Sequence, residues 1–118
     1  MSSRTENEVL FAYGTLRQTN VQMALFGRPL TGQADTLVGY NLGPLEIIDP
    51  AVIAASGSAL HTIARQTGNS LDKLPGLVFR ITPEELALAD EYEVADCKRV
   101  RVRLASGIQA FVYVSAAT

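Results

Sequence analysis

The sequence has little of the residues that build disulfide frameworks and metal centres. Its 118 residues include one cysteine, Cys97, one histidine, His61, and no tryptophan. A single cysteine excludes an intramolecular disulfide, and a single histidine excludes a histidine-rich metal site within one chain. We therefore expect no metal in the function.

The sequence also lacks an excess of charge and a long apolar run. Lys and Arg number 10 and Asp and Glu 12, which gives a net charge of −2. Because nucleic-acid-binding domains carry strongly basic surfaces, we expect no nucleic-acid partner. The longest apolar stretch, Ala51–Ala55, is far shorter than a membrane span. Residues 1–8 are polar, without the apolar segment of a signal peptide. We expect a soluble, cytoplasmic protein without membrane contact.

What the chain does contain is typical of a folded domain. Hydrophobic residues make up 47% and charged residues 19%, a composition found in globular proteins. The length corresponds to a single domain. We therefore expect a frayed tail over residues 1–8 and one domain over residues 9–118.

Short apolar or alternating segments separated by turn residues predict a strand-rich fold. We expect strands at Val9–Tyr13, Thr36–Tyr40, Leu45–Ile48, Gly76–Ile81, Arg99–Leu104 and Ile108–Val114, and His61–Arg65 could form another. Residues 41–44 are expected to break the second strand from the third, and residues 66–75 to form a polar loop. The last two strands follow each other across Ser106-Gly107, a hairpin signal. The pattern predicts an α+β fold with a mixed or largely antiparallel sheet, which could close into a barrel.

Two helices are expected beside these strands. Residues 20–26 have helical spacing, with Asn20 or Thr19 as N-cap and Gly27 as the stop signal. The second helix begins after Thr82, because Pro83 suits the first helical position and Glu85 completes a capping box. It should end near Tyr92 or Glu93.

Glu93 is the first candidate for chemistry. On a helical wheel, Leu86, Leu88, Ala89 and Tyr92 form an apolar stripe, and Glu93 falls inside it. A carboxylate on an inward face is costly unless it is paired or its pKa rises, and functional sites tolerate that cost. The alternatives are that Glu93 lies past the helix end, or that it pairs with Arg99.

The second candidate is the segment that leaves the first strand, Tyr13-Gly14-Thr15-Leu16. Gly14 permits a tight turn after a buried strand, and backbone N–H groups in such a turn can hold an anion. Thr15 adds a hydroxyl group. The alternative is an ordinary strand-ending turn.

Other candidates carry weaker signals. Ser56 and Ser58 precede His61, but no nucleophile-elbow motif surrounds them. Cys97 has no histidine placed beside it by the sequence. Glu46 lies in an apolar segment and could point outward. Arg99, Arg101 and Arg103 alternate with apolar residues, which indicates the solvent-exposed face of a strand.

Together these segments resemble the gamma-glutamylcyclotransferase-like superfamily, in its small avirulence-induced-gene-like branch. The residues that carry the resemblance are Tyr13–Arg17, Gly76-Leu77-Val78-Phe79, Leu88–Glu93, Arg99, Gly107 and Val112-Tyr113-Val114. The resemblance covers residues 9–17 and 76–114 well, and is poor over residues 42–75.

The resemblance implies a small mixed barrel with flanking helices, in which the Tyr13–Leu16 loop and Glu93 meet in one cavity. It implies release of 5-oxoproline from a small gamma-glutamyl compound without a cofactor. In that cavity, Glu93 would transfer the proton. The residues Gly14, Thr15 and Leu16 would bind the substrate, and Tyr13 would line the pocket.

Two departures from the family pattern keep a second hypothesis open. Val94 stands where the family often has glycine, and Cys97 stands where it often has an aromatic residue. The alternative is a non-catalytic small-molecule binding or interaction domain that keeps the fold and cavity. The strand Ile108–Val114 is apolar and could pair with a second copy at a sheet edge, as in a homodimer.

Overall fold

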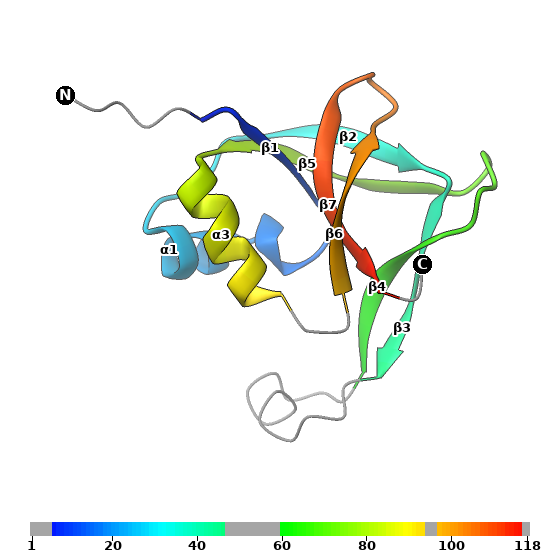
Figure 1. The fold of residues 1–118 in the computed structure, drawn as a ribbon, viewed down its shortest axis with the longest axis horizontal. Helices are drawn as coiled ribbons and strands as arrows, with labels where there is room; N and C mark the ends of the chain where they lie inside the picture. The colour runs from blue at the N-terminus through cyan, green and yellow to red at the C-terminus, as the bar shows by residue number, and fades with distance from the viewer. Residues whose placement is uncertain (1–5, 47–59, 94–96, 117–118) are drawn as a thin grey trace.

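The strands form one mixed, seven-stranded sheet in a computed structural model that describes residues 6–46, 60–93 and 97–116 (Figure 1). The strands are β1 (Glu8–Ala12), β2 (Gly32–Val38), β3 (Tyr40–Glu46), β4 (Leu60–Gln66), β5 (Lys73–Ile81), β6 (Cys97–Arg103) and β7 (Gln109–Ser115). The helices of the described ranges are η1 (Thr15–Arg17), α1 (Thr19–Phe26) and α3 (Pro83–Tyr92).

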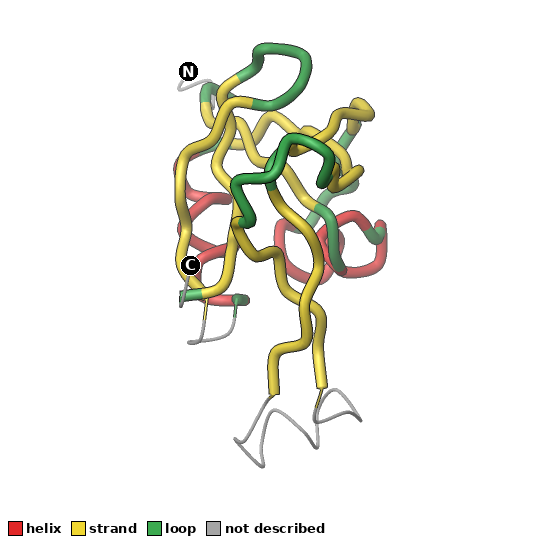
Figure 2. The backbone as a smooth tube through the Cα atoms, turned by 90° about the vertical axis from the view of Figure 1, so that its right-hand side faces the viewer, coloured by secondary structure: helices red, strands yellow, loops and turns green. Residues whose placement is uncertain are grey.

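The strand order is β2-β5-β1-β7-β4-β3, with β6 paired on β7. Strand β5 runs antiparallel to β1 and β2, whereas β1 and β4 both run parallel to β7. The predicted α+β class with a mixed sheet is therefore correct. The predicted barrel is not confirmed, because β2 and β3 end the ladder and the sheet is not closed. Figure 2 shows β3 and β4 running side by side away from the rest of the sheet.

The core lies on both faces of the sheet. Side chains of a strand alternate between faces, so Leu10 and Ala12 of β1 pack under the helices while Phe11 packs on the opposite side. The helix-side cluster also contains Leu16 of η1 and Ala89 of α3. The cluster therefore joins β1 and η1 to the last turns of α3.

Three local predictions need correction. The strand pair β2–β3 turns at Gly39, not at residues 41–44, because Gly39 adopts a φ of +86° that favours glycine. The loop after β4 ends at Asp72, and Pro75 belongs to β5. Pro75 is tolerated because β5 pairs only with β2 at that point. Helix α1 is capped by Gln18 without a side-chain hydrogen bond, rather than by Asn20 or Thr19.

The predicted start of α3 is confirmed. The Thr82 side chain accepts from the Glu85 N–H, and the Glu85 side chain accepts from the Thr82 N–H.

The strand β7, predicted as a possible sheet edge, is not one, because it pairs with β6 on one side and with β1 and β4 on the other. A homodimer stays a prediction, without this strand as its basis.

Candidate functional site

The loop after β1 presents backbone donors. The chain turns at Gly14 into η1, where Arg17 N–H donates to the Gly14 carbonyl at 3.1 Å. The N–H groups of Gly14, Thr15 and Leu16 meet no acceptor among the described residues, as is usual for the first turn of a helix. A Cβ added at Gly14 would meet nothing within 4 Å, so a side chain at this position would enter open space.

Glu93 lies directly after α3. Helix α3 ends at Tyr92, and Glu93 is the C-cap with extended backbone angles, its N–H donating to Ala89 at 3.1 Å. The helical wheel that singled it out therefore no longer applies at Glu93. The stripe itself is only partly inward, since Leu86 and Ala89 are buried but Leu88 and Tyr92 are 38% and 42% exposed.

Glu93 is nevertheless half-buried. Its carboxyl group makes no hydrogen bond and no ion pair with a described residue. Burial alone raises the pKa of Glu93 from 4.5 to about 7. A carboxyl group with that pKa is partly protonated at neutral pH, so it can both accept and donate a proton.

The structure brings the loop and Glu93 together. The Thr15 hydroxyl shares a 2.7 Å hydrogen bond with the hydroxyl of Tyr92, the residue before Glu93. Burial raises the pKa of Tyr13 to about 12, and the charge of Glu93 contributes to that rise. Glu93 therefore lies within electrostatic range of Tyr13, and the loop bonds to the residue beside Glu93.

A polar network near Glu93 was not predicted from the sequence. Asp90 accepts from the Tyr113 hydroxyl and from Arg99, both at 2.7 Å. Arg99 also lies over the ring of Phe111, 4.8 Å from its centroid. Arg99 therefore pairs with Asp90 rather than with Glu93. No local signal marks this network, since Asp90 and Tyr113 are 23 positions apart.

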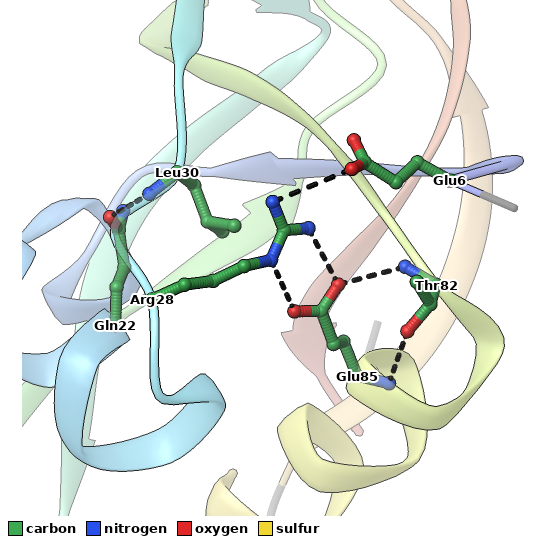
Figure 3. Close-up of polar contacts among 6 residues, drawn as sticks. All are labelled: Glu6, Gln22, Arg28, Leu30, Thr82 and Glu85. Carbon is green, nitrogen blue, oxygen red and sulfur yellow. Dashed lines mark hydrogen bonds and ion pairs between the residues drawn. The ribbon is translucent and has the colours of Figure 1, made fainter. Parts of the chain in front are cut away.

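A second network fixes the elements that carry the site (Figure 3). Arg28 donates two hydrogen bonds of 2.8 Å to the buried carboxylate of Glu85, at the start of α3. The buried Gln22 side chain donates to the Leu16 carbonyl at 2.9 Å and accepts from the Leu30 N–H at 2.8 Å. These contacts hold the loop to α1 through Gln22, and α3 to the segment between α1 and β2 through Arg28.

Several sequence candidates are not part of this arrangement. Ser56, Ser58 and Val94, with the side chains of Glu46 and His61, lie outside the described residues. Cys97 is half-buried at the start of β6, close enough to Tyr13 for its charge to raise the pKa of that residue. Among the described residues, no cluster of His, Cys, Asp and Glu has the composition of a metal site. None of their helices is long and apolar enough to cross a membrane.

A shallow depression lies elsewhere on the sheet. Its volume is about 170 Å³. It is lined by Asn7, Glu8, Val9, Arg101, Gln109, Ala110 and Phe111. None of the predicted site residues lines it.

These features define an α+β domain in which a half-buried acid follows a helix whose last residue, Tyr92, is hydrogen-bonded to the loop after β1. A family model described as "Gamma-glutamyl cyclotransferase, AIG2-like" matches residues 10–118. The chain belongs to this family, as the sequence resemblance indicated.

Solved structures share the fold. A protein from Arabidopsis thaliana, determined in solution, superposes with a TM-score of 0.68 at 18% identity, over 99% of this chain and 67% of that one. An uncharacterized protein from Pyrococcus horikoshii, determined by crystallography, superposes with a TM-score of 0.61 at 19% identity, over 95% of this chain and 80% of that one. No curated protein matches the chain.

Proposed function

We propose that this protein is a gamma-glutamyl cyclotransferase that releases 5-oxoproline and an amine from a small gamma-glutamyl compound. The observation that carries the proposal is Glu93, a half-buried acid without a partner among the described residues, placed beside the Tyr13–Leu16 loop. Membership of the gamma-glutamyl cyclotransferase, AIG2-like family supports the reaction class.

The reaction is an intramolecular aminolysis. The substrate's α-amine attacks its own γ-carbonyl carbon, which forms the C–N bond of a five-membered lactam. The Glu93 carboxylate takes the proton that the amine loses. The resulting carboxyl group then gives this proton to the departing amine as the original amide bond breaks. No electrons are transferred, so the step needs acid–base chemistry and no redox cofactor.

The loop supplies the second requirement of this chemistry. Negative charge develops on the γ-carbonyl oxygen during the attack, and preorganised N–H donors stabilise it. The N–H groups of Gly14, Thr15 and Leu16, which meet no described acceptor, are the donors we assign to a substrate oxygen, either this one or the α-carboxylate. Thr15 is exposed, and its hydroxyl is bonded to that of Tyr92.

A product assay tests the proposal. Purified protein is incubated with gamma-glutamyl amino acids, gamma-glutamyl amines and glutathione, and 5-oxoproline is measured by mass spectrometry. We expect product from the wild type and a loss of at least about 100-fold in Glu93→Gln, the usual range for an acid–base group. The matched control is Glu91→Gln, which changes an exposed carboxylate in the last turn of α3, two residues before Glu93, and should keep full activity.

Absence of product from every compound, in protein shown to be folded, would contradict the proposal. That outcome would favour the non-catalytic binding domain, for which the departures Val94 and Cys97 are the argument. Equal loss in Glu91→Gln and Glu93→Gln would remove the special role of Glu93.

A further inference from the structure

The sheet contains a fork at the strand that contacts the site. One edge of β7 pairs with β6 along its whole length. The other edge is shared, with β1 paired at Leu10 opposite Phe111 and β4 paired at Ala64 opposite Val114. Between these two points β1 has ended at Ala12 and its chain turns away into the loop. Tyr113 lies at this change of partner.

The Tyr13 side chain fills the fork. Its hydroxyl donates to the backbone carbonyl of Tyr113 at 2.5 Å and accepts from the backbone N–H of Ala64 at 3.0 Å. The hydroxyl thus occupies the place of a backbone rung between β7 and β4. Its single proton is committed to Tyr113, and one of its lone pairs to Ala64.

Tyr113 also links Tyr13 to α3, the helix that Glu93 follows. Tyr113 receives Tyr13 at its carbonyl, and its own hydroxyl donates to Asp90 in the last turns of α3. On the other side of the loop, Thr15 bonds to Tyr92. The segment that follows Tyr13 is therefore tied to the end of α3 by two routes, one through β7 and one direct.

We infer that Tyr13 is a positioning residue. Its hydroxyl bridges the backbones of β7 and β4 in place of a direct hydrogen bond between them, and this bridge holds the Gly14–Leu16 loop beside Glu93. This role differs from lining a pocket or donating a proton to substrate, because the hydroxyl already donates its proton to one backbone carbonyl and accepts from one backbone N–H. Its consequence for turnover rests on the proposed function, whereas its structural part does not. Burial keeps the hydroxyl protonated, and so donating, throughout the neutral pH range.

The test combines a spectroscopic signature with a minimal variant. In the wild type, NMR should detect a slowly exchanging Tyr13 hydroxyl proton with a cross-peak to the Ala64 amide. This measurement needs no variant, so it stands even where a variant fails to fold. In Tyr13→Phe, which removes only the oxygen, the Ala64 amide should exchange at least tenfold faster.

The matched control is Ser106→Ala in the β6–β7 hairpin, which also removes a hydroxyl hydrogen bond, in this case the one that Ser106 donates to Asp35 of β2. Tyr13→Phe should lower the pKa of Glu93 toward its ordinary value, because a loosened loop admits water, and Ser106→Ala should not. Where the wild type turns over a substrate, Tyr13→Phe should lower kcat at least tenfold and change KM less than threefold.

Unchanged Ala64 exchange in Tyr13→Phe, or the absence of the slow hydroxyl proton, would overturn the inference. So would a change in KM alone, because that would assign the hydroxyl to the substrate. A wild type without any product would contradict the proposed function, while the Ala64 and Glu93 measurements would still decide the role of Tyr13.

Discussion

Among the single residues, Glu93 holds a carboxyl group that is partly withdrawn from water. Charging Glu93 in the folded state costs free energy because no described residue pairs with it. In the unfolded chain the same group is well hydrated and keeps its ordinary pKa of 4.5. The folded protein therefore holds a proton that the unfolded chain has already lost between pH 4.5 and about 7.

This difference predicts how stability depends on pH. Where the native state binds more protons than the unfolded state, the free energy of unfolding falls as pH rises. We expect Glu93→Gln to be more stable than the wild type at pH 8, and this advantage to disappear below about pH 4.5. Urea denaturation of both proteins across this range measures it. An advantage that does not change with pH would show that Glu93 titrates normally.

The sequence could indicate Glu93 but not its surroundings. An acid close to an apolar stripe is visible in a local pattern, although the helix ends one residue too early for the wheel to apply. The role of Tyr13 depends on Tyr113 and Ala64, which are 100 and 51 positions away. Such contacts depend on how the strands are ordered, and no local pattern of residues encodes that order.

At the scale of elements, α3 is fixed at both of its ends. At its start, Glu85 is 3% exposed and takes two hydrogen bonds from Arg28. The Arg28 side chain is itself 37% exposed, so its removal leaves the buried Glu85 carboxylate with only part of its hydrogen bonds. Arg28→Met, which keeps most of the apolar stem, should lower the free energy of unfolding by about 1–3 kcal/mol. The control is Arg80→Met, because Arg80 is exposed on β5.

The same pair gives a second dependence on pH, of the opposite sign. The hydrogen bonds from Arg28 hold the pKa of Glu85 below its ordinary value. The stabilisation is therefore complete above the unfolded pKa of 4.5 and is lost as pH falls through the lower folded pKa. The gap in stability between wild type and Arg28→Met should narrow on acidification below pH 4.5, as followed by thermal unfolding. A gap that widens would contradict this assignment.

Element boundaries were predictable where the signal is local. Thr82, Pro83 and Glu85 are neighbours in sequence and make the capping contacts that their types favour. The predicted N-cap of α1, Asn20 or Thr19, was wrong. The N-cap is Gln18, and no side chain caps the first N–H groups of this helix, so the cap-forming residue types at 19 and 20 did not mark its start. The turn between β2 and β3 depends on Gly39, which the stronger turn composition of residues 41–44 concealed.

At the scale of the whole molecule, the site depends on how closely β1 lies against β5. A Cβ added at Gly76 would lie 2.5 Å from the carbonyl oxygen of Ala12, a backbone atom, and 2.7 Å from the ring of Phe11. We expect Gly76→Ala to cost about 2 kcal/mol or more, as overpacked cores do. Gly14→Ala, with open space around the added methyl group, should change stability by less than about 0.5 kcal/mol.

Chemical denaturation of the two alanine variants compares these sites. Equal stability would show that β1 and β5 separate readily. A large loss in Gly14→Ala would show that the loop is packed more tightly than its surroundings indicate. Neither contact was visible in the sequence, because the pairing of β1 with β5 joins segments about 70 positions apart, from Glu8 opposite Ile81 to Ala12 opposite Leu77.

We propose that the fold keeps the Glu93 carboxyl group ready to accept and return a proton. The most direct test is an NMR titration of the side-chain carboxyl carbon of Glu93, assigned by comparison with Glu93→Gln. We expect a midpoint of about 7, well above the ordinary 4.5. A midpoint close to 4.5 would show that Glu93 is fully hydrated, and would contradict its assignment as the proton carrier.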